Sequence, residues 1–253
     1  MANCQPPNDS LEKIKKSLKQ KRYCQAIPVS AITKNLEGKE LVEVEEIKPY
    51  VVGFSDDGKY LANLNLLKKI LEKDVLVLVH CSPPYEIGVK NPRLETKFIE
   101  RYIELLKKMN PVRKGLSNGA RKGNLHIQHI TKKETVNLIR KAKKEGIRIS
   151  CETCPHYFTY TKDDLETRVN PPLAEREDLI ALRRGLADGT IDVIASDYAP
   201  LPRISGIAGF RAFVPLCYGL VLSGILTKEQ LKEKIYLNPK KLIESSGQKV
   251  FRA

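Results

Sequence analysis

Short apolar runs alternate with longer amphipathic stretches along most of the chain. The short runs are rich in Val and Ile and are apolar at nearly every position, which is typical of strands buried on both faces. The longer stretches repeat apolar residues every three or four positions and predict helices. The predicted strands cover residues 23–32, 50–56, 75–80, 125–130, 147–153 and 193–200. The predicted helices cover residues 63–74, 95–109, 132–146, 175–189 and 227–237.

This alternation predicts an α/β fold with a parallel sheet, either a TIM-type (β/α)8 barrel or a doubly wound sheet. A length of 253 residues suits one large domain and provides enough chain for a sizeable core. No linker and no short repeat divides the sequence, so we expect a single domain over residues 1–253. The stretch 110–124 is rich in Gly and basic residues, and it is either an active-site loop or plain surface.

Charge and cysteine content narrow the range of partners. The net charge of +14 comes largely from lysines that alternate with glutamates on helix faces, and clustered aromatics are missing, so a solvated surface is favoured over a nucleic-acid interface. Runs such as "VLVLV" are too short to cross a bilayer, and no apolar signal segment begins the chain. The six scattered cysteines indicate reduced thiols. We therefore expect a cytoplasmic protein with neither a nucleic-acid nor a membrane partner.

Metal-competent side chains follow four of the predicted strands. Asp56 and Asp57 end the second strand, His80 ends the third, His129 ends the fourth and Asp197 ends the last. In a parallel β/α barrel the carboxyl ends of all strands meet at one rim, where the chemistry is done. Imidazole and carboxylate groups are ligands that Zn²⁺ accepts. Any one of these residues is as often a core or capping group, but their shared placement favours a metal site.

Three further positions carry alternatives. His126 lies three residues before His129, so the two side chains of a strand point to opposite faces. We expect His129 to face the rim and His126 to be structural. Cys151 and Cys154 form "CETC", which suggests a redox or zinc pair, but ordinary buried cysteines are favoured because no second CxxC occurs. Asn170, in a Pro-rich loop before a helix, is either part of a loop and cap or a substrate contact on the rim.

Taken in order, several segments resemble the dihydroorotases of the amidohydrolase superfamily. These are "FSDDG", "HC", "HIQHITKKETVNLIRKAKKEGI", "ETCPHYFTYTKDDL", "RVNPPLAEREDLIALRRGLADGTIDVIASDYAP" and "LNPKKLIES". The opening "MANCQPPND" is similar to the family's "MPNTxPP" segment. The resemblance covers essentially the whole chain and is most specific between His126 and Pro200. It is closest to the version of the family in which Asp replaces a carboxylated lysine as the metal bridge.

The resemblance implies a function and a set of roles. Family members form a β/α barrel, bind one or two zinc ions and reversibly hydrolyse dihydroorotate to N-carbamoyl-aspartate in pyrimidine synthesis. Asp57 corresponds to the residue that bridges the metals, and His80 and His129 to the ligands of one zinc. Asp197 corresponds to a ligand of the other zinc that also acts as general base or acid. Asn3 and Asn170 correspond to substrate-binding asparagines.

The sequence also departs from the family pattern. Strand 1 of the family carries H-x-H and a substrate-binding Arg, and no H-x-H occurs here. The family's "DHAPH" reads "DYAPL", so Tyr198 and Leu201 replace two histidines, and "HCED" reads "HCSP". No sequence remains for the family's accessory β-sandwich. We therefore expect a barrel without strand 1, its gap either open or covered by another chain or by N-terminal residues, and little or no turnover by the 253-residue chain.

Three interpretations of this pattern stay open. The chain is a dihydroorotase whose recorded sequence begins at an internal methionine, or an inactive homologue that serves as a partner or scaffold subunit. The third is a related cyclic-amide hydrolase, such as a dihydropyrimidinase or allantoinase, which "FSDDG" disfavours. The expected partners are a small-molecule substrate and either further copies of the chain or another subunit of the pyrimidine pathway.

Overall fold

A parallel sheet forms the centre of the molecule. The computed structural model describes residues 9–19, 27–56, 61–81, 93–110, 124–165, 169–199 and 209–244. Four strands lie in the order β1-β2-β3-β4, and each pairs in parallel with the next. They are β1 (Leu76–Val79), β2 (Asn124–Ile127), β3 (Ile149–Thr153) and β4 (Val193–Ile194).

Two further segments continue the sheet beyond β1. Phe54 forms parallel bridges to Ser30 on one side and to Val77 of β1 on the other. Backbone hydrogen bonds join these segments, since Ser55 N donates to Ser30 O at 2.8 Å and Leu78 N donates to Phe54 O at 2.8 Å. Six parallel positions therefore follow one another in chain order. The α/β class with a parallel sheet is confirmed.

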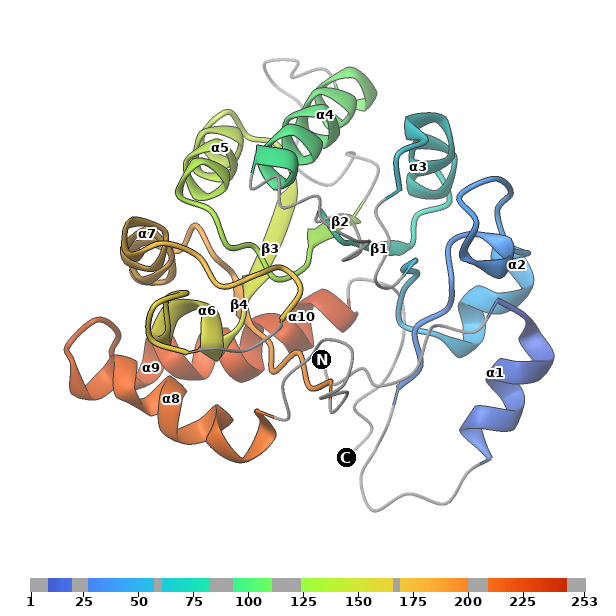
Figure 1. Cartoon of the computed structure of the whole chain (residues 1–253). Helices are drawn as coiled ribbons and strands as arrows, with labels where there is room; N and C mark the ends of the chain where they lie inside the picture. The colour runs from blue at the N-terminus through green and yellow to red at the C-terminus, as the bar shows by residue number, and fades with distance from the viewer. Residues whose placement is uncertain are drawn as a thin grey trace.

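Helices pack along the outside of this sheet and continue beyond its last strand (Figure 1). The helices between and after the strands are α3 (Leu64–Leu71), α4 (Arg93–Met109), α5 (Lys133–Lys144), α6 (Pro155–Thr159) and α7 (Arg176–Ala187). Near the N-terminus lie α1 (Leu11–Leu18), α2 (Val44–Ile47) and the 3-10 turns η1 (Lys34–Leu36) and η2 (Lys48–Tyr50). After β4 come α8 (Phe210–Leu222), α9 (Lys228–Lys232), the π-helical turn η4 (Glu233–Leu237) and α10 (Asn238–Glu244).

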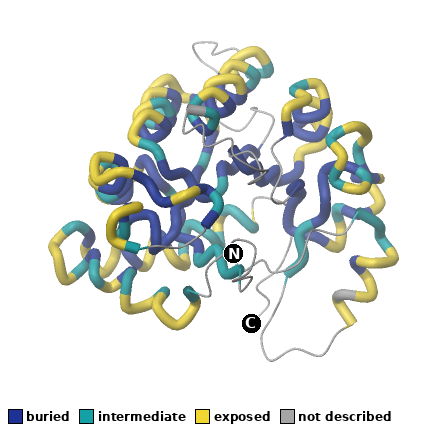
Figure 2. Tube along the Cα trace, in the orientation of Figure 1, coloured by how far each residue is buried: buried dark blue, intermediate teal, exposed yellow. Residues whose placement is uncertain are grey.

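The main hydrophobic core lies between the sheet and its outer helices. Val77, Leu125 and Ile149 are register partners on neighbouring strands, and all three belong to this core. The apolar faces of α3, α4, α5 and α7 pack against it. In Figure 2 the strands and the inward turns of the helices are buried, and the outer turns of the helices are exposed. Helix α7 packs closely against α5, because a Cβ on Gly185 of α7 would lie 3.0 Å from the Val136 side chain of α5.

The opposite face of the sheet points into the interior. Leu78 and His126 are register partners on that face. A cavity of about 190 Å³ lies there, lined by Val52, Leu76, Leu78 and Glu152 and by residues of α8, η4 and α10. Because the family's strand 1 is missing, we expected a gap in the barrel, either open or covered by another chain or by N-terminal residues. Among the described residues, the helices nearest the C-terminus line this face.

No helix within the described ranges combines the length and apolarity needed to cross a membrane. The assignment of residues 1–253 to one domain stays a prediction.

Candidate metal and active site

The rim, meaning the edge of the sheet where the carboxyl ends of the strands meet, gathers residues from three strands. His80 directly follows β1, His129 lies two residues beyond β2, and Asp197 lies three beyond β4. The rings of His80 and His129 lie edge to face with their centroids 4.6 Å apart, and both residues are buried. Asp57 and Asn3 lie outside the described residues, so their positions stay predictions.

Two of these residues have unusual backbone conformations. His129 has φ of 34° and Asp197 has φ of 45°, both in the left-handed region that residues other than glycine rarely occupy. Such conformations cost about 1–3 kcal/mol each and occur preferentially at functional sites. The turns after β2 and β4 therefore hold the two side chains in positions that a relaxed strand end would not give.

Burial favours the neutral form of His129. Desolvation and the neighbouring His80 lower the pKa of the His129 imidazole, against the opposing charges of Asp197 and Glu152. Its Nδ1 is buried and has no hydrogen-bond partner among the described residues. A neutral imidazole with a nitrogen free of hydrogen bonds is the form that binds a metal ion.

Helix α6 brings two more donors to the rim that the sequence reasoning did not identify. One ligand-competent atom from each of Cys154, His156 and Asp197 lies within 4.8 Å of the other two. Burial, followed by the nearby His129, lowers the pKa of His156 to about 3, and its buried Nε2 has no hydrogen-bond partner among the described residues. The signal was present in the sequence, because "CPH" follows a predicted strand as His80 and Asp197 do.

The CxxC spacing suggested Cys151 as the partner of Cys154, but in the structure Cys154 lies beside Asp197. Cys151 and Cys154 are both buried and both free. Cys151 Sγ donates to Thr190 O at 3.4 Å on the core side of the sheet, whereas Cys154 lies beside Asp197. The preference for buried, unpaired cysteines is confirmed, but the two thiols have different surroundings.

His126 has a structural environment. Its Nδ1 lies 2.8 Å from Ser150 Oγ and its Nε2 lies 3.1 Å from Glu152 Oε2, and the side chain is fully buried. Burial alone would raise the pKa of the Glu152 carboxyl, but the hydrogen bond and charge of His126 hold it at about 2. These contacts tie β2 to β3 on the inner face, below the rim, in agreement with the expectation for His126.

Asp56 is also occupied by structural contacts. Its carboxylate accepts hydrogen bonds from Ile32 N at 2.8 Å, from Thr33 N at 2.9 Å and from the Thr33 hydroxyl at 2.5 Å. The first of the two aspartates in "FSDDG" therefore links the first two sheet segments.

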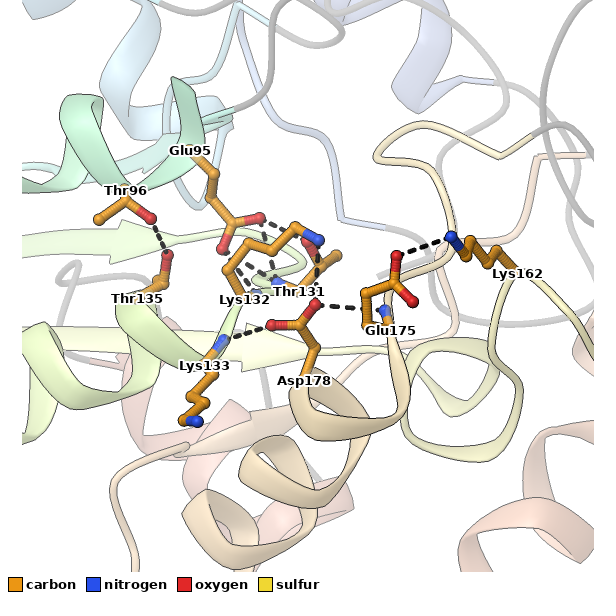
Figure 3. Close-up of polar contacts among 9 residues, drawn as sticks. All are labelled: Glu95, Thr96, Thr131, Lys132, Lys133, Thr135, Lys162, Glu175 and Asp178. Atoms are coloured by element: carbon orange, nitrogen blue, oxygen red, sulfur yellow. Dashed lines mark hydrogen bonds and ion pairs between the residues drawn. The ribbon is translucent and has the colours of Figure 1, made fainter. Parts of the chain in front are cut away.

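The loop that carries His129 is anchored to two helices (Figure 3). Glu95 of α4 accepts from Thr131 N at 3.1 Å, from the Thr131 hydroxyl at 2.6 Å and from Lys132 N at 3.1 Å. Asp178 of α7 accepts from Lys133 N at 2.8 Å and pairs with Lys132 at 3.0 Å. Burial raises the pKa of the Glu95 carboxyl, and these hydrogen bonds oppose that rise. The turn after β2 is thus held from both sides.

The loop that carries Asn170 contacts α6. Asn170 is half-buried and its bond to Pro171 is cis, while the Tyr157 hydroxyl donates to Pro171 O at 2.7 Å, linking this loop to α6.

Tyr198, which replaces a family histidine, packs edge to face against Phe210 with ring centroids 6.1 Å apart. Leu201 lies outside the described residues.

Comparison with known proteins shows which enzymes the chain is similar to. No protein-family model matches the chain. A dihydroorotase from Acetivibrio thermocellus is 36% identical over 271 aligned residues, which include 96% of this chain and 64% of that protein. The chain is similar to dihydroorotases over nearly its whole length. Because it spans less than two thirds of such relatives, the activity of a dihydroorotase comes to it only as a proposal.

Solved structures show the same fold at low sequence identity. The L-hydantoinase (dihydropyrimidinase) of Arthrobacter aurescens superposes with a TM-score of 0.73 at 21% identity, over 94% of this chain and 61% of that one. The dihydroorotase of Saccharomyces cerevisiae, solved in complex with 5-fluoroorotic acid, superposes with a TM-score of 0.70 at 16% identity, over 96% of this chain and 75% of that one. These neighbours are TIM-barrel amidohydrolases, and the fold of this chain is similar to theirs. Metal binding is general in this family, and the Cys154, His156 and Asp197 group is a partial candidate site.

Proposed function

We propose that this protein is a dihydroorotase, which interconverts dihydroorotate and N-carbamoyl-aspartate in pyrimidine biosynthesis. The observation that carries the proposal is the arrangement of His80, His129 and Asp197 at one rim, in a chain 36% identical to a dihydroorotase. The electrostatic influence of both His80 and Asp197 on His129 is consistent with one compact group.

The proposal includes zinc, and the residues present fit a cation. His129 Nδ1 and His156 Nε2 are buried nitrogen atoms without hydrogen-bond partners among the described residues, and the Asp197 carboxylate lies close to them. His80 and His129 would hold one zinc ion and Asp197 would hold a second, with Asp57, outside the described residues, as a further ligand. When bound, zinc lowers the pKa of a water molecule and polarises the carbonyl of the cyclic amide.

Asp197 is the proposed catalytic residue. As the water oxygen adds to the ring carbonyl carbon, the Asp197 carboxylate accepts the proton that the water loses. Asp197 then delivers this proton to the ring nitrogen as the carbon–nitrogen bond breaks, so that the ring opens and the carboxylate is regenerated. Asn170, and Asn3 in the part that is not described, contact the substrate.

The wider setting follows from the same proposal. The substrate is a small molecule, the reaction takes place in the cytoplasm, and the chain assembles with further copies of itself or with another subunit of the pyrimidine pathway. Sedimentation of the purified protein, alone and with candidate subunits, measures that last part.

The decisive experiment measures hydrolysis together with metal content. The purified, zinc-loaded protein is incubated with dihydroorotate, and N-carbamoyl-aspartate is quantified by chromatography. The missing ligands predict little or no turnover by this chain, so turnover that disappears on chelation and returns with zinc would support the proposal and correct that expectation. A folded, zinc-loaded protein without turnover would contradict the proposal and favour the inactive-homologue interpretation. Preference for dihydrouracil or allantoin over dihydroorotate would favour the third interpretation.

A further inference from the structure

Three donors of different chemistry meet at the rim from two neighbouring strands. Cys154 directly follows β3 and His156 lies in the first turn of α6, while Asp197 follows β4. Because β3 and β4 are paired, with Thr153 opposite Ile194, residues beyond these two strand ends are brought together. The three donor atoms lie within 4.8 Å of one another.

This group has the composition of a zinc site. Thiolate, imidazole and carboxylate are the three protein ligand types of Zn²⁺, and three such ligands leave a fourth position for water. In a tetrahedral site with bonds of about 2.0–2.3 Å, the ligand atoms lie roughly 3.5 Å apart. The three donor atoms lie within 4.8 Å of one another, so their side chains would move closer together on binding an ion.

A second observation points to a ligand at the same place. His156 is 3% exposed, and its Nε2 has no hydrogen-bond partner among the described residues. Burying a polar group without a partner costs free energy, about 1–3 kcal/mol in proteins. The Tyr157 ring lies next to the imidazole, with a centroid distance of 4.1 Å and an interplanar angle of 52°. A metal ion would satisfy the unpaired nitrogen.

We propose that Cys154, His156 and Asp197 together bind a zinc ion, separately from the His80 and His129 pair. This inference deepens the metal centre of the proposed function and rests on it only for the link to hydrolysis. It gives Asp197 two protein partners within the described residues. It also alters the sequence-based expectation of little turnover, which assumed that Asp197 lacked partners for its metal.

The first test needs no variant. X-ray absorption spectra of the zinc-loaded native protein report the atoms around the metal. We expect a zinc–sulfur shell at about 2.3 Å beside nitrogen and oxygen at about 2.0–2.1 Å. Coordination by nitrogen and oxygen alone, or failure of the folded protein to take up zinc, would overturn the proposal.

The second test assigns the sulfur atom. Co²⁺ replaces zinc, and a thiolate ligand produces a charge-transfer band in the near ultraviolet. We expect the band in the native protein, its loss in Cys154→Ser and its retention in Cys151→Ser, a matched variant at a buried cysteine of the same segment. A band that persists in Cys154→Ser would contradict the assignment. Near-ultraviolet circular dichroism establishes that each variant is folded.

The third test measures affinity. In His156→Ala, the dissociation constant for Zn²⁺ should rise by more than the ~10–100-fold caused by loss of an outer-shell partner. An unchanged affinity would remove His156 from the site.

The outcomes separate this inference from the proposed function. A zinc–sulfur shell without dihydroorotate turnover would leave the inference standing and remove the function. Turnover with a metal coordinated only by nitrogen and oxygen would do the reverse.

Discussion

Polar side chains have different surroundings at the two edges of the sheet, where the strands begin and where they end. Asp192 directly precedes β4, and its carboxylate accepts from Cys151 N at 2.9 Å and pairs with Lys143 Nζ at 2.6 Å. Asp197, beyond the other end of the same strand, has a left-handed backbone and lies beside Cys154 and His156. The first aspartate is placed by its contacts, whereas the second is held where it can meet a ligand.

His126 in β2 and His129 just beyond it show the same contrast. His126 is within hydrogen-bonding distance of Ser150 and Glu152, while His129, three residues later, has a buried Nδ1 without a partner among the described residues. Satisfied buried polar groups stabilise the fold, and unsatisfied or strained ones persist where function requires them. Position relative to the rim, and not residue type, separates the two roles.

The largest expected effect is on catalysis at the carboxyl end of β4. Asp197→Asn should lower dihydroorotate hydrolysis about 10³-fold, because the amide cannot accept and return the proton. Its thermal unfolding should change little. Initial rates and calorimetry on the zinc-loaded protein measure both quantities.

Asp192→Asn is the matched control at the amino end. It should keep the rate per folded molecule and lose about 1.5–3 kcal/mol of unfolding free energy, since a charged hydrogen-bond acceptor is removed. Equal losses of rate in both variants would break the comparison.

The next effect is on stability and distinguishes the two histidines. His126→Ala should reduce the free energy of unfolding by about 3–5 kcal/mol, because the buried Glu152 carboxylate loses its partner. His129→Asn should change it by less than about 1 kcal/mol, since Asn tolerates a left-handed backbone. Urea unfolding of the metal-free variants measures both. A large loss in His129→Asn would show that this residue, too, is structural.

A smaller effect on stability tests whether the segment around Gly53 pairs with β1 as part of the sheet. A Cβ on Gly53 would lie 2.9 Å from Leu76 O of β1, so Gly53→Ala should cost about 1–3 kcal/mol of unfolding free energy. Gly219→Ala in α8, where nothing lies within 4 Å, should be neutral or stabilising by up to about 1 kcal/mol. Similar results for the two variants would contradict the parallel bridge at Phe54.

The smallest effect concerns the ion pairs near the rim. Lys133 and Glu177 form an exposed pair at 2.8 Å, and Glu177→Ala should change the unfolding free energy by less than about 1 kcal/mol, an effect that salt reduces. Asp178→Ala should cost more, because Asp178 also accepts from Lys133 N in the loop that carries His129. Equal effects would show that this carboxylate does not anchor the loop.

Local pattern predicted the regular elements well where the pattern is strong. The run that became β1 was recognisable because it is wholly apolar, and α5 and α7 were recognisable because their apolar residues repeat at helical spacing. Helix α8 was missed. It contains Pro215 and exposes apolar residues such as Val214 and Leu222, so it lacks the polar face that identifies a surface helix.

The candidate site was predicted in part for the same reason. His80, His129 and Asp197 each end a recognisable strand, so their convergence at the rim followed from parallel topology. Cys154 and His156 were not selected, because the CxxC spacing suggested a partner in sequence, whereas the partner in space is Asp197. No local pattern reports such a contact across 41 residues, from His156 to Asp197.

The sequence by itself determined the order of the strand and helix units and the residues that end each strand, because side-chain periodicity is a local property. Tertiary structure alone decided which of those residues meet. The pairing of β3 with β4 places Cys154 and His156 beside Asp197, and the left-handed turns at His129 and Asp197 orient their side chains. The strand pairing and the turn conformations both depend on packing between distant segments. The same packing gives the His126 ring hydrogen-bonding partners and leaves His129 Nδ1 without one among the described residues.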